Sequence, residues 1–512
     1  MIAAALTPII PIAFAFLLPL FSIICGYRKR LIQLYALVGT GLTLWAAVDL
    51  FEATFASSVP LIYTFGKWHA PIGIVYEVDR LSALLALLIA VLMFLIAVYS
   101  VEYLRAEEGI SWYFTLYLGL EAGLLGAVLT GDAFNFFVMI EVTSITAYGL
   151  VAFYRRRRDA VAASLKYAFI GALGTTLYFL ALGVFYGAFG TVNLADLSAK
   201  VHGFVFPITN VATGNIVLAS GLALALAMWA FLIKAAIVPN HFWLPEAHPA
   251  APSPISAILS GLVVNIGIYA IIRFLFTVYG TPLDGRLQTV VNTLRSVLMA
   301  LGAISAIFAA LTMTVQTDIK RLIAYSTIMH MGYLVMAVSL GTMFGLQAAV
   351  FHLVNHALAK ALLFLAAGVV IHAAGSRNLA QLKGMGRRMP LTSFALTVGA
   401  LALIGVPPFN VFFSKLALFN AFWEKSSVAA IVLVLSSAIA LVAYTKVFCT
   451  VWLENPKSEP AGNEPAVMSS VVLFLALLCL ALGIIAPMIF GRFIEPTAAQ
   501  VIDFFAYIHG VL

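Results

Sequence analysis

A few ionisable residues lie deep inside long apolar stretches of this chain, away from any loop signal. Glu141 follows Phe-Phe-Val-Met-Ile, and Lys234 follows Trp-Ala-Phe-Leu-Ile. Lys360 and Lys415 have similarly apolar neighbours. A charge in such surroundings costs several kcal/mol, so we expect these side chains to have a function.

Three histidines extend this set. His352 and His356 are four residues apart, which places them on one helix face, and Lys360 continues the same face. His330 lies in the preceding apolar stretch. Two histidines at this spacing could hold zinc, but no third ligand stands at a fixed spacing nearby, so a metal site is the lesser alternative.

Lysine, histidine and carboxyl groups in one apolar region have the chemistry of a proton pathway, because surroundings can tune each to exchange protons near neutral pH. Burial lowers the pKa of a lysine and raises that of a carboxyl, whereas an ion pair does the opposite. At about 10 Å and an effective dielectric near 20, one unit charge contributes roughly 1.7 kcal/mol. Separating Glu141 from Lys234 would therefore favour proton release. A static Glu141–Lys234 ion pair is the structural alternative.

The composition places these residues in a membrane. Of 512 residues, 63% are hydrophobic and 10% are charged, and the mean hydropathy is +1.06, far above what a water-soluble core requires. Apolar runs of about 20 residues predict spanning helices, and the short alternating segments of a β-barrel are not present in the sequence. We therefore expect an all-α integral membrane protein in contact with the lipid bilayer.

Cofactors and nucleic acid are disfavoured as ligands of this chain. Cys25, Cys449 and Cys479 stand alone, without the spacing of zinc, iron–sulfur or disulfide sites. The net charge of +7 reflects basic residues in short loops, which membrane topology explains better than nucleic acid.

Hydropathy predicts about fourteen spanning helices, the first of them retained and not cleaved. Residues 60–78 carry prolines and glycines among aromatic and β-branched residues, which predicts a small outer hairpin. We divide the chain into N-terminal helices (1–110), two half-channels (111–280 and 281–453) and a fourteenth, C-terminal helix (454–512). The predicted spans are 5–25, 31–51, 79–101, 111–130, 133–154, 164–189, 213–238, 254–279, 289–311, 319–341, 344–373, 391–420, 427–452 and 467–490.

Basic residues predict the orientation. With the N-terminus outside, most of them lie on the cytoplasmic side, as the positive-inside rule requires. The cytoplasmic set is Arg28, Lys29, Arg30, Arg105, Arg155, Arg156, Arg157, Arg158, Lys320, Arg321, Arg377, Lys383, Arg387, Arg388 and Lys457. The opposite set is Lys67, Lys200, Arg286, Arg295, Lys425 and Arg492.

Two predicted spans are interrupted by proline-containing segments, Lys234 to Pro245 in the seventh and Leu403 to Asn410 in the twelfth. Broken helices at matching places in two halves are typical of inverted repeats around a midplane ion site. We therefore expect inverted five-helix repeats, helices four to eight and nine to thirteen. Ordinary proline kinks are the simpler interpretation of each break taken alone.

Several motifs occur in an order that resembles the proton-antiporter family, which includes antiporter-like subunits of respiratory complex I, Mrp cation/proton antiporters and membrane-bound hydrogenases. The motifs span most of residues 79 to 420. They are Asp79-Arg-Leu-Ser82, Asp132-Ala-Phe-Asn-Phe-Phe137, His241-Phe-Trp-Leu-Pro-Glu-Ala-His248 with its Pro-rich continuation to Ala257, Lys320-Arg-Leu-Ile-Ala-Tyr-Ser326, and Gly405-Val-Pro-Pro408 before Lys415.

The resemblance implies a role for each residue. Glu141 resembles the fifth-helix glutamate that pairs with and gates the seventh-helix lysine, Lys234. Lys415 resembles the twelfth-helix residue that ends the second half-channel. The central connection implied by the resemblance comprises His330, His352, His356 and Lys360, and we add His241 to the pathway.

One position departs from the family pattern. Many relatives carry a lysine in the eighth helix, where this chain has Asn265. Asn265 cannot titrate, so a proton wire through it would rely on water or on the histidines. Asp132, Lys166 and Lys446 are further candidates, although both lysines could instead reach the membrane surface.

The resemblance implies an ion-translocating subunit, moving protons, sodium or both, in a prokaryotic cytoplasmic membrane. The Glu246-Ala-His-Pro motif favours a hydrogenase-like or related energy-converting complex. Its other membrane subunits and peripheral redox subunits would be the partners, and those redox subunits would carry iron–sulfur clusters and nickel–iron. The corresponding subunit of an Mrp-type Na+/H+ antiporter, without redox partners, is the alternative. A stand-alone solute carrier or a purely structural subunit is less favoured.

Overall fold

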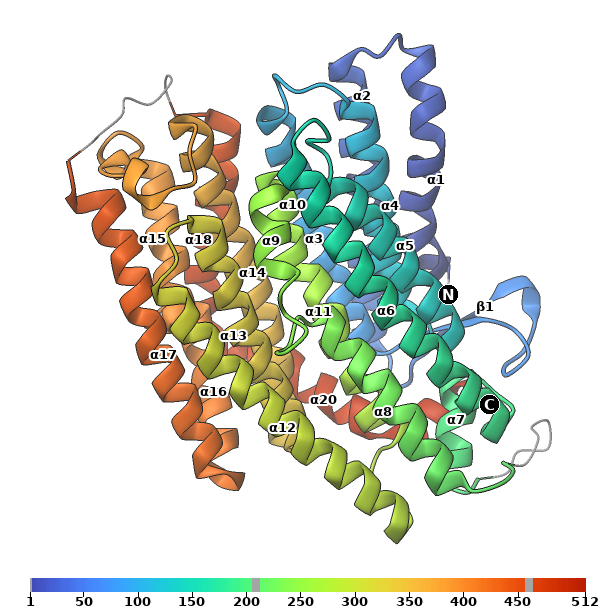
Figure 1. The fold of residues 1–512 in the computed structure, drawn as a ribbon. Helices are drawn as coiled ribbons and strands as arrows, with labels where there is room; N and C mark the ends of the chain where they lie inside the picture. The colour runs from blue at the N-terminus through green and yellow to red at the C-terminus, as the bar shows by residue number, and fades with distance from the viewer. Residues whose placement is uncertain (1, 205–211, 456–463) are drawn as a thin grey trace.

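The computed structural model describes residues 2–204, 212–455 and 464–512. It is a bundle of long helices with one small hairpin (Figure 1). Among the described residues, 13 helices are long and apolar enough to cross a membrane. The predicted twelfth span is divided between two shorter helices, α15 (Pro390–Ile404) and α16 (Asn410–Lys425). The expected all-α membrane fold is therefore confirmed.

The N-terminal region holds the predicted hairpin. Strands β1 and β2 pair antiparallel, with Leu61 opposite Val78 and Thr64 opposite Val75. Asp79 then caps the next helix by accepting a hydrogen bond from the Ser82 amide. The elements are α1 (Ile2–Ile24), α2 (Lys29–Ala56), β1 (Leu61–Thr64), η1 (Phe65–Lys67), β2 (Val75–Val78) and α3 (Arg80–Tyr103).

The next two groups of helices follow one pattern. The first group is α4 (Ile110–Leu129), α5 (Ala133–Val151), α6 (Arg158–Phe189), α7 (Leu194–Val201), α8 (Ile216–Lys234), α9 (Leu244–Ala250), α10 (Ser253–Ile258), η2 (Leu259–Val263), α11 (Val264–Ile272) and η3 (Arg273–Val278). The second is α12 (Gly285–Thr314), α13 (Ile319–Ser339), α14 (Met343–Ala374), η4 (Leu379–Gln381), η5 (Met385–Arg387), α15, α16, α17 (Ser427–Phe448) and η6 (Cys449–Leu453).

Matching local contacts relate the two groups. Asp132 caps α5 and forms a backbone bridge with Asn193, and Asp318 caps α13 and forms the same bridge with Asn378. The helices between them, α6 and α14, both have 32 residues. Each group crosses the membrane five times, so the second group starts on the opposite side and the repeats are inverted.

Both predicted breaks are present. Helix α8 ends at Lys234, and the Trp243 indole donates to the Ile233 carbonyl of its last turn at 3.1 Å. Helix α15 ends at Gly405, whose φ of 92° favours glycine. A helix that stops inside the bundle leaves carbonyls without intrahelical partners, and other groups must satisfy them.

Cations satisfy backbone carbonyls in the segment that follows the first break. The Lys320 ammonium donates to the Ala251 carbonyl at 2.8 Å and is 3% exposed. Arg321 and Arg377 donate to the carbonyls of Pro245 and Pro249. Lys320 therefore does not lie in a solvated loop, because the exposed carbonyl ends of α9 attract a positive charge.

Two residues assigned to the opposite loops are also buried. Lys200 forms an ion pair with Asp196 at 3.1 Å, and Arg295 donates to the Leu275 carbonyl at 3.2 Å. Both satisfy local acceptors, so they carry less topological information than charges in open loops. Lys457 lies outside the described residues.

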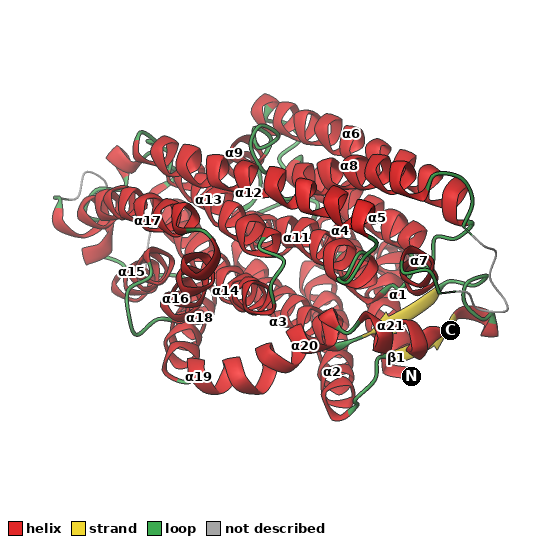
Figure 2. Ribbon diagram, turned by 90° about the horizontal axis from the view of Figure 1, so that it is seen from below, coloured by secondary structure: helices red, strands yellow, loops and turns green. Residues whose placement is uncertain are grey.

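The C-terminal region contains more than the one helix predicted. Helix α18 (Ala466–Ile484) is followed by α19 (Ala486–Ile489), η7 (Phe490–Ile494), α20 (Glu495–Ile502) and α21 (Phe504–Val511). Seen from below, α19 and α20 run along one edge of the bundle, past α18 and α3 (Figure 2). The Gln500 side chain accepts a hydrogen bond from the Arg80 amide at 2.8 Å, which fixes α20 to the start of α3.

Replacing Lys320 by methionine should destabilise the protein. The change keeps an unbranched side chain, one atom shorter, but removes the ammonium and leaves buried carbonyls unsatisfied, at a cost of about 1–3 kcal/mol. Thermal unfolding of the purified complex should therefore begin at a lower temperature. Arg30→Met, at an exposed arginine, is the control; equal unfolding temperatures for both variants would contradict the assigned role.

Candidate ion-translocation site

The first lysine of the site lies where α8 breaks. Lys234 is the last residue of α8, and its ammonium donates to the Ser144 hydroxyl of α5 at 2.6 Å. Ser144 itself donates to the Ile140 carbonyl of its own helix. The end of α8 is thus tied to the middle of α5 inside the bundle.

Glu141 lies one turn before Ser144, on α5. In the described part of the chain no carboxylate oxygen, including those of Glu141, lies within 4 Å of the Lys234 ammonium. Glu141 is half-buried, between the exposed side chains of Val138 and Ile145. It therefore lies at the surface of the chain and close to Lys234 without a direct ion pair.

The second lysine lies at the centre of α14. Lys360 is fully buried and donates to the Ser326 hydroxyl and, at 3.1 Å, to the Ile323 carbonyl. The Tyr444 hydroxyl of α17 donates to the same Ser326 oxygen at 2.7 Å. One serine of α13 therefore joins a lysine and a tyrosine from two other helices.

The three predicted central histidines come together. His330 Nδ1 lies 3.0 Å from His352 Nε2, and His352 Nδ1 lies 3.0 Å from the Ser414 hydroxyl. The ring centres of His330 and His356 are 5.2 Å apart. The described residues contain no group of three or more His, Cys, Asp or Glu able to hold a metal ion. A hydrogen bond links the imidazoles of His330 and His352, and the His356 ring packs against both.

The third lysine lies beyond the second break. Lys415 of α16 donates to the Ser437 hydroxyl at 3.0 Å and to the Ile404 carbonyl at 3.1 Å. Ser437 also lies 3.3 Å from the Tyr333 hydroxyl, and the Tyr333 ring contacts His330 edge-on. Hydroxyl and imidazole groups therefore connect Lys415 with the histidines.

The three lysines share one arrangement. Each donates to a serine hydroxyl, and within the described ranges none has a carboxylate within 4 Å. A hydroxyl can accept from a charged ammonium and donate to a neutral amine, so it suits both protonation states. A carboxylate would hold the charged form.

Between the first and second lysines, α11 and η2 contribute uncharged polar side chains. Asn265 donates to the Gly261 carbonyl at 2.6 Å, and Ser260 shares a hydrogen bond of 2.7 Å with Thr327 of α13. His241 lies in the α8–α9 connection and packs against Phe308. The structure thus places His241 at the edge of the break, apart from the histidine cluster.

The remaining candidates lie at the ends of helices. Lys166 is 56% exposed and forms an ion pair with Glu246 at 2.7 Å. Lys446 is exposed and donates to the Gln316 carbonyl at 3.0 Å. Asp132 caps α5 by accepting from the Asn135 amide at 2.7 Å. Burial raises the pKa of Asp132 to about 6, although the hydrogen bonds from backbone amides act to lower it.

Sequence reasoning missed several buried polar residues. Glu121 of α4 is fully buried, and it interrupts an apolar run just as Glu141 does, so the same signal could have found it. His248 stacks on Phe364 with both ring nitrogens unpartnered among the described residues. The serines that pair with the lysines gave no signal, since serine is ordinary in membrane helices.

The chain has two broken helices, inverted repeats and a row of buried lysines and histidines. These features are typical of polytopic membrane proteins that transport ions. Residues 130–440 match the family model described as NADH:quinone oxidoreductase/Mrp antiporter, TM. Residues 61–114 match that of the N-terminus of NADH-ubiquinone oxidoreductase (complex I) chain 5. The chain belongs to the NADH:quinone oxidoreductase/Mrp antiporter family.

Relatives come from different complexes. The chain is 29% identical to a Na(+)/H(+) antiporter subunit of Alkalihalophilus pseudofirmus, over 98% of this chain and 99% of the relative. It is 31% identical to hydrogenase-4 component B of Escherichia coli, over 84% and 65%. In the solved structure of the archaeal membrane-bound sulfane sulfur reductase, a chain superposes with a TM-score of 0.89 and 32% identity, over 99% of both chains.

Replacing Ser144 by alanine should slow ion transport about tenfold, which corresponds to losing about 1.4 kcal/mol of stabilisation. The variant removes the hydroxyl that orients the Lys234 ammonium, whereas Ser144→Thr keeps it. Transport is measured with a pH-sensitive dye in vesicles that contain the whole complex. Ser470→Ala, at an exposed serine of α18, is the control, and an unchanged rate in Ser144→Ala would refute the assignment.

Proposed function

We propose that this chain conducts protons through Lys234, Lys360, the histidine cluster and Lys415, as the antiporter-like subunit of a larger energy-converting complex. The observation that carries the proposal is the pairing of all three buried lysines with serine hydroxyls and not with carboxylates. Each amine can then gain or lose a proton without breaking an ion pair. Sodium is the alternative cargo.

We assign the chain to a complex that also contains redox subunits. The likeness to the sulfane sulfur reductase and to hydrogenase-4 component B supports a respiratory or hydrogenase-type assembly. Iron–sulfur clusters, and nickel–iron in a hydrogenase, would then reside in the partner subunits. Charge changes in those partners would drive proton movement here. The corresponding subunit of an Mrp-type antiporter, without redox partners, is the second candidate, supported by the relative from Alkalihalophilus pseudofirmus.

A neighbouring membrane subunit would face Glu141. The carboxylate is half-buried on a face of α5 where Phe134, Val138 and Ile145 are exposed. A charged group at a lipid-facing surface is costly, and a partner helix would cover it. A charge in that partner could then change how strongly Glu141 attracts the Lys234 ammonium.

The membrane assigned to the chain is a prokaryotic cytoplasmic membrane, with the N-terminus outside. The orientation rests on the basic residues of the α1–α2 and α5–α6 connections. Cysteines placed at Arg156 and at Ser57, after replacement of the three native cysteines, should be labelled by an impermeant maleimide from the inside and the outside respectively. The reverse labelling would overturn the orientation.

Replacing Lys234 by arginine should abolish coupled ion transport while the complex still assembles. Arginine keeps the positive charge but does not release its proton in proteins, so a proton relay stops there. Transport is followed with a pH-sensitive dye in vesicles, and assembly is followed by co-purification of the partners. Lys29→Arg, at an exposed lysine, is the control; a wild-type rate in Lys234→Arg would remove Lys234 from the pathway.

The type of complex can be determined by purification in mild detergent, with mass spectrometry of the co-purifying subunits and metal analysis. We expect iron–sulfur subunits, with nickel if the partner is a hydrogenase. Small membrane subunits without metal would instead establish the Mrp-type alternative.

A further inference from the structure

A second buried carboxyl lies outside the row of buried lysines and histidines. Glu121 is the twelfth of the 20 residues of α4, about 12 Å from the helix end at Leu129 at 1.5 Å per residue. It is 0% exposed, and neither of its carboxyl oxygens has a hydrogen-bond partner among the described residues. A buried polar group without a partner costs about 1–3 kcal/mol, so its presence calls for an explanation.

Glu121 faces away from the α5 site. Helix α4 packs on α5 through small residues: a Cβ on Gly123 would meet Thr143, and one on Gly119 would meet Thr146. Positions two residues apart on a helix point in nearly opposite directions. Glu121, two residues from both glycines, is therefore directed away from α5, and it is not a member of the Glu141–Lys234 site.

The other side of α4 packs on α3 and α11. Tyr117, one turn before Glu121, donates to the Met93 carbonyl of α3. The Tyr269 hydroxyl of α11 donates at 2.9 Å to the carbonyl of Val128, two turns after Glu121. Because Tyr117 contacts α3 and Val128 contacts α11, Glu121, which lies between them on the same side of α4, is placed where α3, α4 and α11 meet.

Asn265 is the polar residue of α11 at the matching depth. It lies one turn before Tyr269, on the same face, and its side-chain oxygen is buried without a partner among the described residues. The two helices run in the same direction, so Asn265 lies about 6 Å and Glu121 about 10 Å below the Tyr269–Val128 contact. The Asn265 side-chain oxygen and the Glu121 carboxyl, each without a hydrogen-bond partner among the described residues, therefore lie at neighbouring heights on facing sides of α11 and α4.

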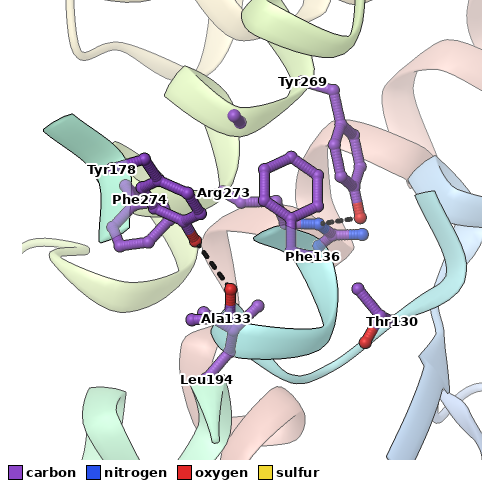
Figure 3. Close-up of a pocket in the computed structure, with 9 residues that line it drawn as sticks. Thr130, Ala133, Phe136, Tyr178, Leu194, Tyr269, Arg273 and Phe274 are labelled. Carbon is purple, nitrogen blue, oxygen red and sulfur yellow. Dashed lines mark hydrogen bonds between the residues drawn. The ribbon is translucent and has the colours of Figure 1, made fainter. Parts of the chain in front are cut away.

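The row of polar residues formed by Asn265 and Tyr269 continues to Arg273, on the side of the bundle where the hairpin lies. The Arg273 guanidinium donates to the Tyr269 hydroxyl at 3.0 Å and forms a buried ion pair with Asp79. Figure 3 shows Arg273 and Tyr269 beside a cavity that Thr130 also lines. The cavity offers about 10 Å³ for the centre of a water-sized sphere, which is the room that one water needs.

The row of polar residues ends at a carboxyl of the hairpin, that of Glu77. Glu77 of β2 is 1% exposed and packs against Gly131 in the α4–α5 turn. Burial raises the pKa of the Glu77 carboxyl well above its usual value. The buried Glu77 carboxyl therefore favours its protonated form.

No strong charge near Glu121 offers a simpler explanation. Apart from Glu141 and Arg273, the charged residues on elements packed against α4 lie within about two turns of the helix ends or on the hairpin. They are Lys29, Arg30, Asp49, Glu52, Arg80, Glu102 and Glu77. In the described ranges none forms an ion pair with Glu121.

We propose that Glu121 is a further proton-exchanging carboxyl of the translocation machinery, linked to the hairpin side through Asn265, the Tyr269 hydroxyl and the water-sized cavity beside it, while Arg273 holds that hydroxyl in place and does not itself pass the proton. The proposal rests on the proposed function and adds a side branch, outside the Glu141–Lys234 site, to the same pathway. Asn265 orients the carboxyl or a water between the two groups, because an amide cannot itself carry the charge. Protons would enter or leave this branch near Glu77.

The test uses the whole complex in vesicles and the Glu121→Gln variant. The amide has the same shape as the carboxyl but cannot release a proton. We expect at least a tenfold loss of ion transport with an unchanged unfolding temperature, and partial activity in Glu121→Asp. Glu52→Gln, at an exposed glutamate of α2, is the control. Wild-type transport in Glu121→Gln would overturn the proposal.

Chemical labelling gives a second readout that a structural role would not produce. A hydrophobic carbodiimide reacts with protonated carboxyls in apolar surroundings, and mass spectrometry locates the adduct. We expect labelling at Glu121 that decreases as the pH rises. No adduct at any pH, or protection by sodium at constant pH, would overturn proton exchange at this site. The Lys234→Arg variant distinguishes a failure of the proposed function from a failure of the Glu121 proposal. If Lys234→Arg stops transport and Glu121→Gln does not, only the Glu121 proposal fails.

Discussion

The structure depends on one kind of contact, the hydrogen bond between a buried lysine and a serine hydroxyl. Lys234, Lys360 and Lys415 come from three helices and each meets a serine of another helix. A carboxylate partner would repay more of the desolvation cost, but it would fix the lysine in its charged form. The hydroxyl gives up that stabilisation and leaves the proton free to move.

The broken helices make this contact possible. Lys234 lies at the end of α8, and Lys415 donates to the Ile404 carbonyl that the end of α15 leaves free. Each break brings freed carbonyls and a cation together inside the bundle, and Lys320, Arg321 and Arg377 stabilise the first break from the other side. The same need to satisfy backbone groups in lipid therefore shapes both the fold and the site.

The sequence predicted the spans, the breaks and the buried lysines and histidines, because each charge interrupts an apolar run and each break carries prolines. It could not predict the partners of those charges: Ser144 and Lys234 are 90 positions apart, and only helix packing joins them. The start of a helix near Lys320 was predicted, but the burial of its ammonium was not, because the carbonyls that bury it belong to a distant segment. Glu121 interrupts an apolar run and was predictable on the same ground as Glu141.

The most direct test of the account is the Ser326→Asp variant, which gives Lys360 the carboxylate partner that the native chain lacks. Ion transport by the whole complex in vesicles would be measured against Ser326→Thr, which keeps the hydroxyl. The account predicts that Ser326→Asp stops transport while the complex assembles normally, and that Ser326→Thr stays active. Transport at the wild-type rate in Ser326→Asp would contradict the claim that hydroxyl pairing lets these lysines carry protons.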